Sequence, residues 1–257
     1  MIRKVFSFLD QYRLDAVHAA DLHALAGRGT QREITQFVNR RILANLSITA
    51  EDDLVDIGCG DGELLRLAAQ HGVRSAVGVS GSEEEASRLR KTGLNVVQGF
   101  TDSLPFADSS ASVVVCNSVL VIVPRERIAG SLREIARIAR PAARILVGEI
   151  PDKLENADVP RHRSVPAMLW WLLRKRGVRS FVGMCRRLFL SFAKRQPFFL
   201  DVGGEEPFFA TCEEFRLLAE ECGLALERSE PHQELGRAGE PRDSECRWNY
   251  FFRRLGA

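Results

Sequence analysis

The chain has 257 residues, of which 45% are hydrophobic and 27% charged, and its formal net charge is +2. These totals predict a globular protein of one to one and a half domains, and the charge favours no particular partner. No uncharged run approaches the roughly 20 residues of a membrane-spanning helix, and the N-terminus lacks a signal peptide. The six cysteines show no metal-ligand spacing, which predicts reduced thiols in a cytoplasmic protein and no metal site.

The first 50 residues are expected to form a mostly helical cap. Thr30–Glu33 has the capping-box pattern, and apolar residues recur behind it at helical spacing. Residues 11–26 carry polar and aromatic side chains that we interpret as solvated, with ligand contact as the alternative. These side chains are Tyr12, His18, Asp21 and His23.

Strands and helices are expected to alternate between residues 53 and 149. Strands are predicted at 53–57, 75–79, 94–97, 113–116 and 144–149, with helices at 62–71, from 82 to before 93, and at 125–140. Such alternation implies right-handed parallel units in a doubly wound sheet, with a ligand at the carboxyl edge. The loops at 58–62, 80–82, 99–102 and 117–119 would form that site.

A glycine turn links the first predicted strand to the first helix. Gly58, Gly60 and Gly62 alternate with Cys59 and Asp61, and Asp56 precedes them. Glycine is needed where the chain turns sharply or lies against a ligand, and the amides that open the helix favour a polar ligand. The spacing is neither the dinucleotide fingerprint nor a P-loop.

These motifs resemble those of class I S-adenosylmethionine-dependent methyltransferases of the small-molecule (methyltransferase type 11-like) group. The resemblance also covers Gly99–Phe106, Asn117–Leu120, Leu132-x-Glu134 and 140–147. It implies a Rossmann-like α/β fold with a seven-stranded, mostly parallel sheet and an antiparallel last strand. It also implies the cofactor S-adenosyl-L-methionine, a domain over 51–257, and a helical insert at 151–207 that serves as substrate lid. The implied cofactor residues are Asp56, Gly58, Cys59, Gly60, Gly62, Ser80, Phe100, Thr101, Asp102 and Asn117.

Three positions depart from the family pattern. Ser80 stands where the family places the acid that binds both ribose hydroxyls, and Glu83 or Glu84 is a substitute from the next helix. Phe100 replaces the acid near the adenine amino group, which leaves the amide of Thr101 and the carboxylate of Asp102. The usual Phe-Asp before the fourth strand is Ala111-Ser112. A non-catalytic binding or scaffold protein with a degenerate site therefore remains the alternative function.

The insert is basic and aromatic, with no acidic residue from Val159 to Leu200. Two amphipathic helices are predicted at 165–176 and 180–194, joined at Gly177. Three interpretations are open: a lid packed on the sheet, contact of 159–195 with an anionic membrane surface, and a pocket for an anionic or hydrophobic substrate. Nucleic acid is not favoured, because no RNA-binding module is visible.

The C-terminal part is predicted to contain a helix after the capping box Thr211–Glu214, and strands at 224–229 and 247–253. The polar stretch 230–245 is predicted to be a mobile loop. The predicted reaction is methyl transfer to a small acceptor that is hydrophobic, anionic or lipid-linked. His162 and His232 are the candidate general bases, with His18 and His23 behind them, and none lies in a recognisable motif.

Overall fold

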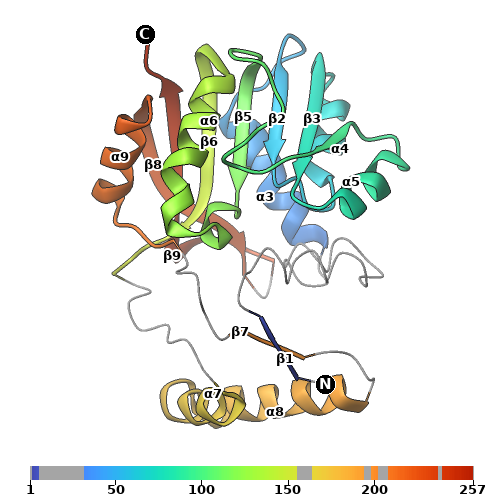
Figure 1. The fold of residues 1–257 in the computed structure, drawn as a ribbon, viewed down its shortest axis with the longest axis vertical. Coiled ribbons are helices and arrows are strands. Elements are labelled where there is room, and N and C mark those ends of the chain that lie inside the picture. Colours follow the sequence, from blue (N-terminus) through green and yellow to red (C-terminus); the bar gives the residue numbers. More distant parts are fainter. Residues whose placement is uncertain are drawn as a thin grey trace. The chain divides into compact units, whose positions relative to one another are not determined.

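The computed structural model describes residues 2–5, 32–154, 164–193, 198–201, 208–236 and 239–256. The chain divides into two compact units (Figure 1). The larger unit comprises residues 12–157 and 207–257, and the smaller one comprises residues 1–11 and 158–206. The predicted histidine and tyrosine candidates at 12, 18, 23 and 162, with Asp21, lie outside the described residues.

The larger unit is built on a seven-stranded sheet with the order β4-β3-β2-β5-β6-β9-β8. Its last strand in sequence is antiparallel to both neighbours, whereas β2 to β6 pair in parallel. The predicted fold class is thus confirmed. The strands are β2 (Asp53–Ile57), β3 (Ser75–Ser80), β4 (Val96–Gln98), β5 (Ala111–Asn117), β6 (Ala139–Pro151), β8 (Leu224–Leu235) and β9 (Pro241–Arg254).

Helices cover both faces of this sheet, which is why its central strands are apolar on both sides (Figure 1). One face packs against α3 (Arg32–Asn45), α4 (Glu63–Gln70) and α5 (Glu83–Arg90). The other face packs against α6 (Ile128–Ile138) and α9 (Cys212–Glu221). Short 3₁₀ turns, η1 (Leu120–Ile122) and η2 (Arg125–Arg127), follow β5.

The helix starts follow the predicted capping signals where these are described. Thr211 and Glu214 form the reciprocal capping box before α9. The Ser82 side chain accepts from the amide of Glu85 and so opens α5. Thr30 lies outside the described residues, so its predicted box stays a prediction.

The polar stretch 230–245 was expected to be a mobile loop, and this expectation was wrong. Strands β8 and β9 continue their antiparallel pairing through Gln233↔Asp243 and Leu235↔Pro241. Polar side chains link the two strands, with Gln233 Nε2 2.9 Å from Asp243 Oδ1 and Arg242 Nη2 2.6 Å from Glu234 Oε1. Cross-strand polar pairs stabilise this hairpin without the apolar alternation that normally reveals a strand.

The smaller unit contains β1 (Ile2–Val5) paired in parallel with β7 (Phe198–Asp201), together with two helices. The helices are α7 (Val165–Trp171), continued by a π-helical turn η3 (Leu172–Arg176), and α8 (Gly177–Ala193). The predicted helix pair and its junction are confirmed, because Gly177 has φ +79°. Of the N-terminal segment that was expected to be mostly helical, residues 2–5 form a strand, Arg32–Asn45 form the helix α3, and residues 6–31 lie outside the described residues. Within the described ranges, no helix has the length and apolar character to cross a membrane.

Candidate cofactor site

The glycine turn lies between β2 and α4, at the carboxyl edge of the parallel strands. Gly58, Gly60 and Gly62 have φ values of +73°, +54° and +77°, a region that favours glycine. The amides of Gly58 and Cys59 both donate to the carbonyl of Val79, at 2.9 and 3.1 Å. The turn is therefore fastened to the end of β3, and Gly62 is the N-cap of α4.

Side chains from other loops close in on this turn. A Cβ on Gly58 would lie 2.3 Å from Cγ2 of Val119, and a Cβ on Gly62 would lie 2.4 Å from Cδ1 of Leu94. Both distances are below 3.0 Å, which Cβ atoms essentially never show. Packing against the stiff Val119 side chain as well as backbone conformation thus requires glycine at 58, whereas at 62 the requirement is mainly the backbone conformation, because the tip of Leu94 can shift.

Asp56 and Cys59 flank the start of the turn and are both buried. Burial, together with the nearby carboxylates of Asp56 and Glu85, raises the pKa of the Cys59 thiol well above its usual range. Cys59 is therefore a neutral packing residue rather than a nucleophile. Its sulfur fills the space beside Gly78, where a Cβ would lie 2.7 Å from Sγ.

Ser80 ends β3 at the carboxyl edge, as predicted, but its hydroxyl faces into the protein. It donates to the Glu85 carboxylate and lies 3.0 Å from the Ser82 carbonyl, and the residue is 1% exposed. Of the expected substitutes, Glu83 pairs with Arg90 and Glu84 is exposed, and a ribose contact by either stays a prediction. The acid beside Ser80 is Glu85, which the capping-box pattern had assigned only to the helix start.

We expect that restoring the family acid at this position destabilises the protein. In Ser80→Asp, the new carboxylate lies beside the buried carboxylate of Glu85. Because no cation compensates these like charges, the free energy of unfolding should fall by about 2–3 kcal/mol. Ser80→Asp/Glu85→Ser should recover most of that loss because one carboxylate again meets one hydroxyl. Urea unfolding of the unchanged protein, the two single variants Ser80→Asp and Glu85→Ser, and the double variant measures this coupling. Equal losses in Ser80→Asp with and without Glu85 would contradict the assignment.

The segment carrying Phe100, Thr101 and Asp102 follows β4 and is held by α6. Ser131 Oγ donates to Thr101 Oγ1 at 2.7 Å. Arg127 Nε lies 2.6 Å from Asp102 Oδ2, and this side-chain hydrogen bond lowers the pKa of the Asp102 carboxyl. Arg127 also donates to the second oxygen, so both carboxylate oxygens of Asp102 take part in this ion pair, and a contact of Asp102 with adenine stays a prediction. The backbone of Phe100 forms an isolated antiparallel β-bridge with that of Ser103, and Phe100 is half-buried.

Asn117 ends β5 and is buried, with Nδ2 3.0 Å from Glu149 Oε1. Glu149 also accepts from Arg247 Nη1 at 2.8 Å, and its oxygen lies 3.8 Å from Nε2 of His232. His232 thus lies in β8 against the carboxyl end of β6, not in a loop after a strand. Glu149, Arg247 and Asn249 were not predicted, because no sequence pattern marks side chains that meet only through sheet order.

The family sequence model described as "Methyltransferase domain" matches residues 55–147, from β2 through most of β6. The match includes the glycine turn, the 99–106 segment and Asn117. This chain carries a class I methyltransferase domain. The predicted family resemblance is confirmed, with S-adenosylmethionine as the cofactor of the family.

Two curated relatives of the methyltransferase domain are similar over about half of this chain. "O-methyltransferase resE" of Aspergillus sclerotiorum is 30% identical over 56% of this chain and 57% of its own length. "27-O-demethylrifamycin SV methyltransferase" of Amycolatopsis mediterranei (strain S699) is 33% identical over 53% of this chain and 54% of its own length. The chain therefore spans little more than half the length of these relatives.

The fold of this chain is also similar to that of a solved structure with low sequence identity. The structure described as the [4+2]-cyclase SpnF has a TM-score of 0.62 and 12% identity, and the match covers 100% of this chain and 99% of that chain. At this identity the likeness concerns the fold. The reaction of the methyltransferase domain must therefore be argued from its site.

The described residues of the methyltransferase domain fit the cofactor at the turn and less well at the ribose position. The turn offers main chain without Cβ atoms and the N-terminus of α4, as a ligand lying against the backbone requires. Ser80 and Asp102, by contrast, direct their polar groups to Glu85 and Arg127. The other predicted cofactor contacts stay predictions, with Asp56, Thr101 and Asn117 grouped at the carboxyl ends of β2, β4 and β5.

Proposed function

We propose that this protein transfers the methyl group of S-adenosylmethionine to an oxygen of a small-molecule acceptor. The observation that carries the proposal is the Cβ-free turn at Gly58 and Gly62, which lies within the matched methyltransferase domain. The relatives named as O-methyltransferase resE and 27-O-demethylrifamycin SV methyltransferase support oxygen as the acceptor atom. The bound cofactor supplies an activated methyl on a sulfonium, so the protein has to orient the acceptor and exclude water.

Calorimetric titration of the full chain with S-adenosylmethionine tests this function. Micromolar binding supports the enzyme, because the glycine turn then holds the cofactor despite Ser80 and Phe100. Each lost charged hydrogen bond costs about 1.5–3 kcal/mol of affinity, so the site tolerates few such losses. Absence of binding favours the alternative, a scaffold protein that retained the fold.

We further propose that the acceptor is hydrophobic or lipid-linked and that the α7–α8 pair contacts an anionic membrane surface. Val178, Val182 and Phe189 lie on one face of α8 and are 66%, 55% and 69% exposed. Arg179 and Arg186 are exposed beside this face. Apolar side chains bordered by arginines are typical of helices that lie in the membrane interface. The absence of acidic residues from 159 to 200 in the sequence favours anionic lipid as the partner.

Replacing Phe189 should weaken membrane binding without affecting the larger unit. An aromatic ring that becomes buried in the membrane interface contributes about 1.5–3 kcal/mol to binding. Phe189→Ser is therefore expected to lower the partition coefficient on phosphatidylserine vesicles by about tenfold or more. Leu217→Ser is the matched control, because Leu217 is also exposed but lies on α9. Binding should decrease as the salt concentration rises, and it should be weaker on neutral than on anionic vesicles. Equal recovery on neutral and anionic vesicles would remove the proposal.

A further inference from the structure

The end of β3 lies beside the glycine turn, so the side chains that follow it border any ligand on that turn. The first amides of the turn bond to the carbonyl of Val79, and the next residue is Ser80. The amide of Gly99 donates to the Ser80 carbonyl at 3.0 Å, which brings the 99–102 segment to the same place. In doubly wound sheets that bind dinucleotides, an acid about 20 residues after the glycine motif binds the ribose. The side chains around Ser80 are therefore the ones placed to meet a sugar.

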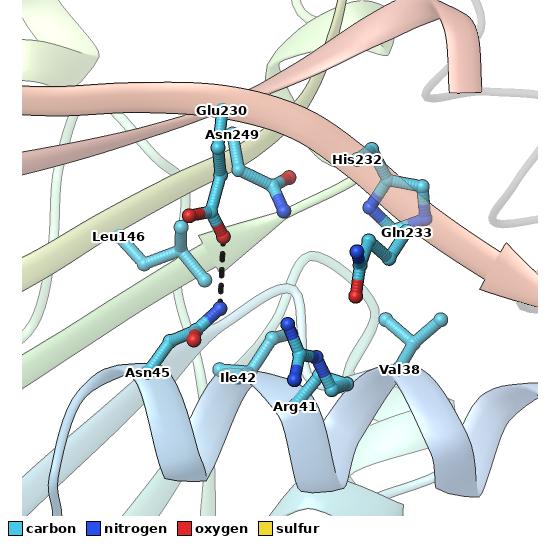
Figure 2. Close-up of a pocket in the computed structure, with 9 residues that line it drawn as sticks. All are labelled: Val38, Arg41, Ile42, Asn45, Leu146, Glu230, His232, Gln233 and Asn249. Carbon is cyan, nitrogen blue, oxygen red and sulfur yellow. Dashed lines mark hydrogen bonds between the residues drawn. The ribbon is translucent and has the colours of Figure 1, made fainter. Parts of the chain in front are cut away.

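The larger unit also has a small pocket between α3 and β8, where Val38 and Arg41 face Gln233 (Figure 2). The side-chain amide of Asn45 donates to Glu230 Oε1 at 2.9 Å across it. The pocket has room for about one water molecule, so neither a purine nor a ribose fits there. It is thus no alternative to the glycine turn as the place of a nucleoside.

The hydroxyl of Ser80 is used within the protein. A serine hydroxyl has one proton and two lone pairs. The proton is donated to the Glu85 carboxylate, and the amide of Ser82 donates to Oγ of Ser80 at 3.0 Å. Because the residue is buried, the remaining lone pair faces the interior as well. Ser80 therefore offers a sugar on the turn neither a donor nor an accessible acceptor.

Glu85 is equally committed to the interior. Its side chain belongs to the first turn of α5, and the residue is 1% exposed. The amide of Glu85 donates to Oγ of Ser82, the N-cap of that helix, at 3.4 Å. The Ser80–Glu85 pair thus fastens the end of β3 to the start of α5. The carboxylate that stands closest in sequence to a family-like sugar ligand holds the protein together instead.

Other acids around the turn also have partners within the protein. Asp61 Oδ1 accepts the first amide of α4 at 3.1 Å. Both oxygens of Asp102 accept from Arg127, and Glu83 pairs with an arginine of its own helix. Glu84 is exposed on the first turn of α5, and it is the acid of this helix start that could still reach a sugar hydroxyl.

We propose that this chain binds its cofactor without a carboxylate at the ribose and does not distinguish a ribose from a deoxyribose. Ser80 and Glu85 determine this specificity, because they bind each other instead of the sugar. Recognition then rests on the main chain of the glycine turn and on the amino-acid end of the ligand. The ligand class is adenosyl thioethers and sulfonium compounds, including those that lack the 2′- or the 3′-hydroxyl. This inference rests on the proposed function and concerns the same site.

Calorimetric titration of the unchanged full chain tests the inference without any substitution. The ligands are S-adenosylhomocysteine, its 2′-deoxy and 3′-deoxy forms, and 5′-methylthioadenosine, which keeps the nucleoside but lacks the amino-acid group. The three homocysteine compounds should bind within about fivefold of each other, because no charged hydrogen bond is lost with either hydroxyl. Methylthioadenosine should bind at least about tenfold more weakly, because it lacks the charged group that main-chain amides and a helix N-terminus favour.

A variant with a carboxylate at position 80 should gain the missing selectivity. In Ser80→Asp/Glu85→Ser, one oxygen of the introduced aspartate can accept from the introduced serine while the other meets the sugar. This double variant should prefer S-adenosylhomocysteine over at least one deoxy form by about tenfold or more, as expected for a charged hydrogen bond. Glu85→Ser alone is the matched control and should bind all three compounds equally, since it adds no carboxylate. Urea unfolding establishes that both variants are folded.

Three outcomes would overturn the inference while leaving the proposed function intact. The first is a loss of more than about fivefold when either hydroxyl is removed from the ligand of the unchanged protein; recovery of equal binding in Glu84→Gln would then assign the sugar contact to Glu84. The second is methylthioadenosine binding as tightly as S-adenosylhomocysteine. The third is equal binding of all three compounds by the folded double variant, since position 80 would then not border the sugar. Failure of the unchanged protein to bind S-adenosylmethionine would instead refute the proposed function.

Discussion

Gly58→Ala is expected to reduce S-adenosylmethionine affinity by at least about tenfold and to destabilise the protein by about 2–3 kcal/mol. Part of the cost is conformational, since φ +73° at Gly58 is unfavourable by about 1–2 kcal/mol for a residue with a Cβ. The remainder is steric, because the new methyl would lie 2.3 Å from Cγ2 of Val119.

Val119 has little freedom to yield to that methyl group. Its β-branched side chain is stiff at χ1, and it packs against the core on the α6 face. The turn must therefore move, and it carries with it the amides of Gly58 and Cys59 that bond to the Val79 carbonyl. Because we propose these atoms as the floor of the cofactor site, we expect the affinity loss to exceed what the loss of stability alone would cause.

Gly72→Ala is the matched control for this prediction. Gly72 has nearly the same backbone angle, φ +75°, but a Cβ there meets nothing within 4 Å. It should lose only the conformational part, about 1–2 kcal/mol of stability, and keep its cofactor affinity. Urea unfolding and calorimetric titration measure both quantities. If the two variants bind the cofactor equally well, the glycine turn is not the cofactor floor.

The sequence predicted the sheet and the glycine turn because their causes are local. The β-branched run 113–116 can only be a buried strand, and Asp56 with the three glycines marks a sharp turn after one. Gly177 correctly marked the junction of the α7 and α8 helices, because glycine adopts its φ of +79° without steric cost and without any contact from a distant segment. Features whose reason lies within a few residues were therefore accessible from sequence.

The features that were missed depend on contacts between distant segments. Glu85 looked like the last residue of a capping box, and only the end of β3 shows that it binds Ser80. The 230–245 hairpin is held by polar pairs such as Arg242 with Glu234, which leave no apolar period. The side chain of His232 meets that of Glu149 only because the sheet order β6-β9-β8 brings the two strands close together. These residues lack a motif because their partners are chosen by topology.

Arg137→Met is expected to cost about 2–3 kcal/mol of stability and to loosen the segment that leads to Thr101 and Asp102. The Arg137 guanidinium lies 2.7 and 2.8 Å from the two oxygens of Glu134 and also donates to the carbonyls of Leu104 and Phe106. Glu134 in turn accepts the amide of Leu104 at 2.8 Å. This network explains why the motifs Leu104-Pro-Phe106 and Leu132-x-Glu134 occur together.

The magnitude follows from the groups that the substitution leaves behind. Methionine keeps the packing of the side-chain stem but leaves two carbonyls without this donor and the Glu134 carboxylate with only the Leu104 amide, which costs more than the removed bonds contributed. The Arg137 side chain is 30% exposed, so water compensates in part and the loss stays below that of a fully buried pair. Arg216→Met is the matched control, because Arg216 binds Glu213 and Glu220 in a similar fork on the surface of α9. Its loss should be much smaller.

The stability that Arg137 contributes is expected to depend on pH. The hydrogen bond from Arg137, aided by the Leu104 amide, lowers the pKa of the Glu134 carboxyl. A carboxyl with a lowered folded-state pKa adds stability above its unfolded value of about 4.3, and that contribution is lost as the pH falls through the folded value. The difference in unfolding free energy between the unchanged protein and Arg137→Met should therefore be largest near pH 7 and narrow towards pH 3. A difference that stays constant over this range, or one no larger than that of Arg216→Met, would mean that packing rather than this ion pair holds the 99–106 segment in place.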